Sequence, residues 1–133
     1  MELCKSVLVV EDDEDVRDCI LQVLNDEGYD AQVAENGKEG LEKLQSMPVP
    51  TLVLLDLMMP SMNGWEFLDA QKRDPKLQGH KIVTISAIKP NASIEDPTPL
   101  KTDGAIKKPI HLELLWEKVN EFCGPSRTTA PAV

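Results

Sequence analysis

Short apolar runs alternate along the chain with longer segments in which apolar residues recur every three or four positions. Five runs predict strands, at residues 7–10, 29–34, 52–55, 81–86 and 104–108. The run at 52–55 is entirely apolar and leads directly into Asp56, which is typical of a strand that helices cover on both faces. The alternation therefore predicts a sheet of short strands connected by helices.

Helical spacing is clearest after the first strand. Apolar residues recur there at intervals of three and four, at Val16, Cys19, Ile20, Val23 and Leu24. Asp13 precedes them as a suitable N-cap, and Gly28 marks the end of the helix. The segment is therefore predicted to be an amphipathic helix that covers the sheet.

Three more helices follow from the same reasoning. One begins at Asn36-Gly37, and one covers 65–72 after Gly64. The last one carries its apolar face on Leu112, Leu115, Val119 and Phe122. The segment at 89–100 contains three prolines and has room for only a short helix. Residues 124–133 lack apolar anchors and are predicted to form a loose tail.

The order of elements is a strand followed by a helix, five times. Such repeats, joined by right-handed crossovers, predict an α/β fold with a parallel sheet and helices on both faces. The common five-stranded solution is the doubly wound, flavodoxin-like (βα)5 fold with strand order 2-1-3-4-5. The length of 133 residues suits one such domain, which we expect to span 1–123.

Composition and charge argue against several classes of function. The net charge of −9 argues against direct binding of nucleic acid, which needs a clustered basic face. No apolar run approaches the roughly 20 residues of a membrane span, and the N-terminus shows no secretion signal. The three cysteines, Cys4, Cys19 and Cys123, form neither a metal motif nor a disulfide framework, and Cys19 is expected to be a buried free thiol. These features predict a cytoplasmic protein.

Charged and polar residues fall where the predicted strands end. Glu11 and Asp12 follow the first strand and Asp56 ends the third, and these strands are neighbours in the predicted order. Ser86 and Lys108 end the fourth and fifth strands at the same edge. Three carboxylates this close repel one another unless a cation binds between them, and Mg²⁺ favours oxygen ligands. Because a carboxylate beside Mg²⁺ and a lysine can accept a phosphoryl group, this edge predicts an aspartyl phosphate.

Four short motifs, in this order and spacing, resemble the receiver domains of bacterial two-component response regulators. They are Val-Leu-Val-Val-Glu-Asp at 7–12, Leu-Leu-Asp-Leu-Met-Met-Pro at 54–60 with Gly64, Ile-Ser-Ala at 85–87, and Lys-Pro at 108–109. The resemblance extends from about residue 6 to 122. It implies a receiver domain over 1–123, followed by a flexible tail or the start of a linker at 124–133.

The resemblance also assigns roles to individual residues. Asp56 would be the phosphoacceptor, and Glu11 and Asp12 the acidic pair of the metal site. Mg²⁺ would be held by Asp12, Asp56 and the backbone carbonyl of Met58. Two further groups would act on the phosphoryl group: Lys108 would pair with it, and Ser86 would move to hydrogen-bond it.

A receiver of this kind is a signalling phosphoacceptor, which assists its own phosphorylation and dephosphorylation, and not a metabolic enzyme. The resemblance implies that a sensor histidine kinase or a phosphotransfer protein supplies the phosphoryl group from a phosphohistidine. Phosphorylation would then switch binding to a downstream protein target, which the sequence does not identify. The chain is expected either to act as a stand-alone receiver or to be one cut from a longer protein.

Two departures from the family pattern keep an alternative open. Ala105 stands where many receivers carry a Tyr or Phe that takes part in the switch, and the segment at 89–100 is rich in proline. The alternative is a pseudo-receiver, an adaptor of the same fold that never cycles phosphate. Other classes fit less well: a haloacid dehalogenase-type phosphatase needs an acid where Met58 stands, and a flavin-binding flavodoxin needs a phosphate loop where this chain has five acids at 11–15.

Overall fold

The sheet determines the architecture of the chain. The computed structural model describes residues 3–59, 62, 64–86, 102–108 and 110–124. Within them, five strands form one parallel sheet in the order β2-β1-β3-β4-β5, as predicted. Their bounds are β1 Ser6–Val10, β2 Ala31–Ala34, β3 Thr51–Asp56, β4 Lys81–Ser86 and β5 Gly104–Lys107.

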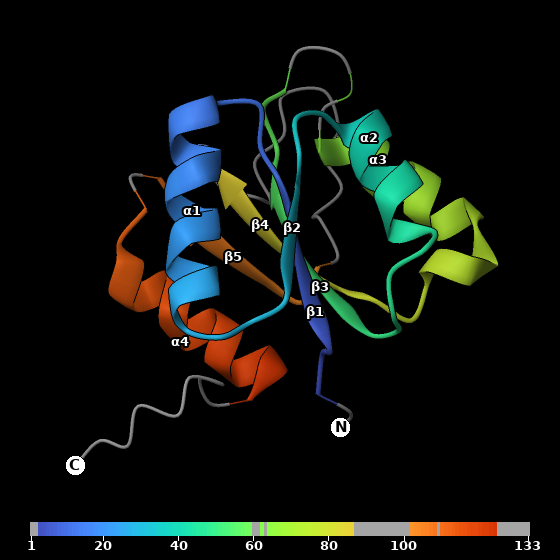
Figure 1. Ribbon diagram of the computed structural model, residues 1–133. Coiled ribbons are helices and arrows are strands. Elements are labelled where there is room, and N and C mark those ends of the chain that lie inside the picture. The colour runs from blue at the N-terminus through green and yellow to red at the C-terminus, as the bar shows by residue number, and fades with distance from the viewer. Residues whose placement is uncertain (1–2, 60–61, 63, 87–101, 109, 125–133) are drawn as a thin grey trace.

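Helices cover the sheet on both faces (Figure 1). One face carries α1 and α4, which span Glu14–Asp26 and Leu112–Cys123. The other face carries α2 and α3, which span Gly37–Leu44 and Gly64–Arg73, and a short 3₁₀ turn, η1, follows at Pro75–Leu77. The short helix predicted within 89–100 and the tail predicted for 125–133 lie outside the described residues.

Alternating side chains divide the apolar core into two layers. Val7 and Val9 of β1 pack in the layer under α1 and α4, whereas Leu8 and Val10 pack in the layer under α2 and α3. The central strand β3 is buried at every position, as its unbroken apolar run predicts. Because both faces are closed by helices, ligands can approach only at the ends of the strands.

The predicted capping residues begin the helices that flank the site. Asp13 caps α1, and its Oδ1 accepts a hydrogen bond from the Val16 N–H at 3.2 Å. Gly28 follows the end of α1 with a φ of 81°, a left-handed conformation that glycine adopts without strain. Asp13 and Gly28 therefore fix the two ends of α1, the helix that follows β1.

Two predictions about burial were wrong. Cys19 is exposed, whereas Cys4 and Cys123 are buried. Consecutive residues of an α-helix are about 100° apart, and Cys19 lies beside the buried stripe that Ile20 occupies. Leu112 is also exposed, although it lies within about 20° of buried Val119 around the helix; it is the first residue of α4, at the end of the apolar stripe.

Candidate functional site

Three carboxylates converge at the carboxyl ends of β1 and β3. The two strands are paired with Val10 beside Leu55, so the residues that follow, Glu11 and Asp56, lie next to each other. Glu11 and Asp56 are buried, whereas Asp12 is exposed. One oxygen from each of these three residues lies within 4.8 Å of the others. The sheet order thus brings together the acids that the sequence places at two strand ends.

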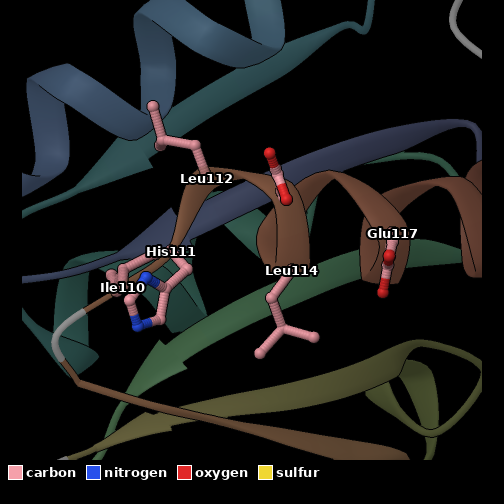
Figure 2. A pocket seen from close by; sticks show the side chains of 6 residues that line it. Ile110, His111, Leu112, Leu114 and Glu117 are labelled. Carbon is pink, nitrogen blue, oxygen red and sulfur yellow. The ribbon is translucent and has the colours of Figure 1, made fainter.

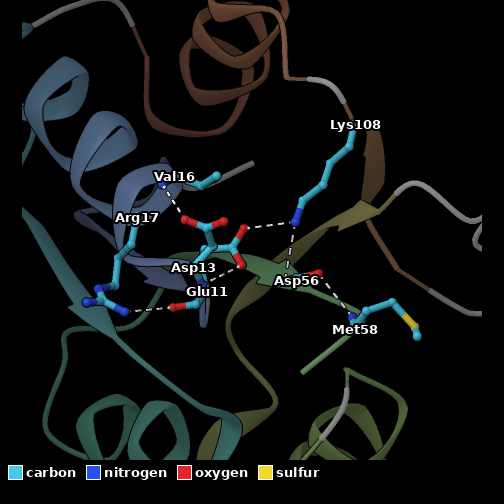
Figure 3. Close-up of polar contacts among 7 residues, drawn as sticks. All are labelled: Glu11, Asp13, Val16, Arg17, Asp56, Met58 and Lys108. Atoms are coloured by element: carbon cyan, nitrogen blue, oxygen red, sulfur yellow. Dashed lines mark hydrogen bonds and ion pairs between the residues drawn. The ribbon is translucent and has the colours of Figure 1, made fainter. Parts of the chain in front are cut away.

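Lys108 reaches the same edge from just beyond β5 (Figure 3). The strand ends one residue earlier than predicted, at Lys107. The Lys108 side chain therefore need not follow the alternating orientation of side chains in the strand. Its Nζ lies 3.1 Å from Glu11 Oε1 and 3.4 Å from Asp56 Oδ2. The long side chain crosses the end of β4, which separates β5 from β3 in the sheet. One ammonium group therefore bridges two of the three carboxylates.

The backbone after β3 also holds Asp56. The Met58 N–H donates a hydrogen bond to Asp56 Oδ1 at 3.0 Å, while Lys108 Nζ donates to Asp56 Oδ2. The Met58 side chain is 54% exposed. The sequence suggested only the Met58 carbonyl as a ligand, and the contact through its amide was not anticipated.

Glu11 is held from its own turn. Its Oε2 accepts from the Asp13 N–H at 3.3 Å, and its backbone carbonyl accepts from Arg17 Nη1 at 3.2 Å (Figure 3). Arg17 was not predicted as a site residue. Its position one turn into α1 could have identified it as a site residue, because a long side chain there can reach back to the end of β1.

The contacts of Glu11 Oε1 indicate whether the three acids suit a cation. It is buried, it has an ion pair with Lys108, and it makes no hydrogen bond to any described residue. Buried polar atoms are ordinarily hydrogen-bonded, so this oxygen has capacity left for a ligand. A hard cation with oxygen ligands and bound water fits this donor set of carboxylates.

Burial raises the pKa of Glu11 to about 8, with a further rise from the nearby Asp56 carboxylate. The Asp13 amide and Lys108 act in the opposite direction but do not cancel the shift. For Lys108, burial disfavours the charged amine, but the contacts with Glu11 and Asp56 outweigh it and raise its pKa. The lysine therefore stays cationic near neutral pH.

The raised pKa predicts how stability depends on pH without metal. Between the ordinary glutamate value of 4.5 and about 8, the unfolded chain has lost the Glu11 proton and the native chain keeps it. The free energy of unfolding should therefore fall as pH rises through this window, by more than about 1 kcal/mol. Urea denaturation in EDTA at several pH values measures the slope.

Glu11→Gln should remove this component of the slope, because the amide does not titrate. Glu14→Gln, a change of the same kind at an exposed neighbour, should keep the slope of the parent. Parallel pH profiles for the parent and Glu11→Gln would show that Glu11 is not the titrating group.

Some predicted site features fall on residues that are not described. Ser86 ends β4 beside Lys107, which places its backbone at the same edge, but its side chain lies outside the described part of the structure. Ala87 of the Ile-Ser-Ala motif and Pro109 of the Lys-Pro motif lie outside the described residues. Ala105 is exposed in β5 beside buried Thr84.

A doubly wound sheet with buried acids and a lysine at the carboxyl ends of its strands defines a receiver-type domain. Comparison with protein families agrees with this class. Residues 7–120 match the family model of the response regulator receiver domain, and the chain belongs to this family. The family confirms the resemblance that the four sequence motifs indicate.

Relatives of the chain are response regulators. It is 34% identical to response regulator RR06 of Streptococcus pneumoniae over 86% of this chain and 51% of RR06. It is 32% identical to the response regulator receiver protein CpdR of Brucella abortus, over 89% of this chain and 96% of CpdR. The chain thus spans about half of the first relative and nearly all of the second.

Solved structures share the fold. A CheY-like receiver domain protein from Methanospirillum hungatei is 32% identical, with a TM-score of 0.76 over 90% of this chain and 94% of that one. Response regulator TrrA from Thermotoga maritima, solved in complex with Mg²⁺-BeF, is 31% identical, with a TM-score of 0.73 over 89% and 98% of the two chains.

Membership of the family establishes the general role of the domain. The chain is a receiver domain of two-component signalling, a signalling domain of the kind that interacts with histidine kinases or phosphotransfer proteins. Receiver domains bind Mg²⁺ at an acidic pocket, and the described residues contain such a cluster. Within the described residues, no helix is long and apolar enough to cross a membrane.

Proposed function

We propose that Asp56 accepts a phosphoryl group from a phosphohistidine of a sensor histidine kinase or a phosphotransfer protein. The observation that carries the proposal is the contact of one buried carboxylate, at the carboxyl end of the central strand, with both Lys108 and the Met58 amide. An Asp56 oxygen bonds to phosphorus as the bond from phosphorus to the imidazole nitrogen breaks. The electron pair leaves with the histidine, which takes up a proton.

The neighbours of Asp56 have separate tasks in this step. Lys108 carries a positive charge 3.4 Å from Asp56 Oδ2, where negative charge gathers on the phosphoryl oxygens. The Met58 N–H keeps the carboxylate oriented through Oδ1. Ser86 would hydrogen-bond the phosphoryl group once it has formed, in keeping with its place at the end of β4.

The acid cluster would hold Mg²⁺. Asp12, Asp56 and the Met58 carbonyl would be its ligands, and Glu11 would complete the acidic pair. When bound, the cation neutralises charge on the carboxylates and on the transferring phosphoryl oxygens. The underbonded Glu11 Oε1 supports this assignment, because a nearby cation would offset the cost of burying that oxygen.

The phosphorylated domain would act as a switch for protein binding. We assign it to residues 1–123, with 124–133 as a tail or the start of a linker, and we place it in the cytoplasm. The downstream target would be a protein, because a net charge of −9 does not suit direct contact with nucleic acid.

Incubation with acetyl phosphate tests the proposal without a partner kinase. With Mg²⁺ present, intact mass should show one added phosphoryl group per chain. With EDTA in place of Mg²⁺, phosphorylation should slow by at least about tenfold, because the carboxylates then repel the incoming anion. No phosphorylation under either condition would favour the pseudo-receiver, an adaptor that keeps the fold without cycling phosphate.

Met58 should prolong the phosphorylated state. Hydrolysis needs a water aligned on phosphorus, and a thioether two residues after Asp56 cannot position it as an amide could. Met58→Asn should therefore speed loss of phosphate by roughly tenfold, about 1.4 kcal/mol in barrier. Time courses after removal of acetyl phosphate measure this, with Met58→Leu as the apolar control. Equal rates for both variants would show that the side chain does not control hydrolysis.

A further inference from the structure

The start of α4 exposes large apolar side chains. Leu112 is 47% exposed, Leu114 38% and Trp116 39%, and these are half of the six exposed large apolar residues in the described part of the chain. Leu112 and Leu114 point to different sides of the helix (Figure 2). The core does not need them, because α4 buries Leu115 and Val119 against the sheet. Exposed large apolar side chains that line a common hollow mark an interaction surface.

Two of these side chains line a groove with α1. The groove has a volume of about 450 Å³, and we call it the α1–α4 groove; it is lined by Val23, Glu27, Leu112, Glu113, Trp116 and Glu117. A second hollow, of about 700 Å³, adjoins it at the start of α4 and shares Leu112, Glu113 and Glu117 (Figure 2). Together the two hollows extend along the start of α4 from Ile110 to Glu117.

The rim of the groove is acidic. Glu113 and Glu117 are exposed and stand four residues apart on α4, where like charges repel and destabilise the helix. Within the described residues, neither makes an ion pair. Glu27 adds a third acid from α1. An apolar floor inside an acidic rim is complementary to an apolar surface flanked by cations.

Charge argues against two other occupants. In a symmetric dimer of this chain through the groove, the Glu113 and Glu117 carboxylates would lie close to those of the second copy. The surface of an anionic membrane would likewise be repelled by the acidic rim. A partner protein that brings lysines or arginines has neither cost.

We propose that the α1–α4 groove binds an amphipathic helix of a partner protein, with leucine-like side chains on one face and Lys or Arg beside them. Such a helix would place apolar anchors between Leu112 and Trp116 and its cations against Glu113 and Glu117. The residues that line the groove include none of the three clustered acids, and the proposal does not depend on phosphorylation. Failure of the test below would leave the proposed phosphoacceptor function untouched.

Tryptophan fluorescence of the unphosphorylated full chain tests the proposal. The sequence has two tryptophans, and Trp65→Phe leaves Trp116 as the only reporter. A synthetic helical peptide of leucine and lysine should shift the Trp116 emission to the blue and saturate, because the peptide covers the indole. A leucine and glutamate peptide of the same pattern should produce no shift at the same concentration.

Matched variants separate the groove from net charge. Glu117→Lys should weaken binding of the leucine–lysine peptide by about tenfold at low salt, because the attraction between residue 117 and the peptide's lysines becomes repulsion. Glu42→Lys changes net charge equally on α2, on the other face of the sheet, and should change affinity by less than about twofold. Equal losses in the two variants would overturn the proposal, since they would show attraction by overall charge alone.

The apolar floor and the rival occupants need their own measurements. Trp116→Ala should lower the affinity for the leucine–lysine peptide by at least about tenfold, as measured by calorimetry. Unchanged affinity would overturn the proposal. Two other outcomes would also overturn it, because each assigns the groove to another occupant: self-association that Leu112→Ser abolishes, or a blue shift with anionic vesicles that exceeds the shift with the peptide.

Discussion

Asp56→Asn should take up no phosphoryl group from acetyl phosphate under conditions that label the parent fully. The amide cannot act as the attacking oxygen nucleophile, so the loss should exceed about a hundredfold, more than about 2.7 kcal/mol in barrier. The fold should persist, because the amide keeps an acceptor for the Met58 N–H and has nearly the same shape. Intact mass measures the label, and circular dichroism confirms the fold.

Asp13→Asn is the matched control for this loss. It makes the same chemical change two residues after Glu11, and asparagine is as good an N-cap for α1 as aspartate. Asp13→Asn should therefore keep full phosphorylation. If Asp56→Asn carried the same label as the parent, another residue would be the acceptor and the assignment of Asp56 would be wrong.

The convergence of Glu11, Asp12 and Asp56 could be predicted because it depends only on backbone topology. An unbroken apolar run identifies β3 as a central strand, and repeated βα units leave few possible strand orders. In the order 2-1-3-4-5, the end of β1 must lie beside the end of β3. No knowledge of side-chain conformation was needed to bring the three acids together.

The contacts within the site could not be predicted in the same way. The bridge from Lys108 to both Glu11 and Asp56 depends on β5 ending at Lys107 and on the course of a long side chain across β4. The reach of Arg17 to the Glu11 carbonyl depends likewise on its side-chain conformation. Rotamers of long side chains follow from packing, which a linear pattern of apolar residues does not specify.

The pattern of apolar residues likewise does not predict which side chains at the edge of a helix's apolar stripe are buried. Cys19 and Ile20 both fit an apolar stripe by spacing, but only Ile20 is buried. The width of the buried face depends on how closely α1 approaches the sheet and α4, and this is a property of the assembled core. Leu112, the first residue of α4, is also exposed and contributes to the α1–α4 groove.

Gly64 makes the closest backbone approach near the acceptor. Its N–H donates to the Leu57 carbonyl at 3.0 Å, which ties the start of α3 to the end of β3. A Cβ atom added at Gly64 would clash with Leu57 Cδ2, would lie 2.7 Å from Leu57 Cα, and would lie 3.2 Å from the Asp56 carbonyl oxygen. A glycine at this position therefore allows the chain to turn directly beneath the phosphoacceptor.

Gly64→Ala should lower the free energy of unfolding by about 2 kcal/mol, and Tm by roughly 6 to 10 °C. The Leu57 side chain could rotate away, but its Cα belongs to the backbone, so relief requires the end of β3 to shift. The gain of up to about 1 kcal/mol from alanine in a helix does not offset this strain. Because Asp56 precedes Leu57, phosphorylation by acetyl phosphate should slow as well.

Gly104→Ala is the matched control, since the same methyl group in β5 would meet its neighbours only at van der Waals distance. Its Cβ would lie 3.5 Å from Val83 Cγ2 and 3.7 Å from Lys118 Nζ, which are ordinary contacts. Its free energy of unfolding should stay within about 0.5 kcal/mol of the parent, and its phosphorylation rate should not change. Urea denaturation and labelling of both variants make the comparison. A Gly64→Ala protein as stable and as readily phosphorylated as Gly104→Ala would show that the turn after β3 yields freely, and that its close packing does not position Asp56.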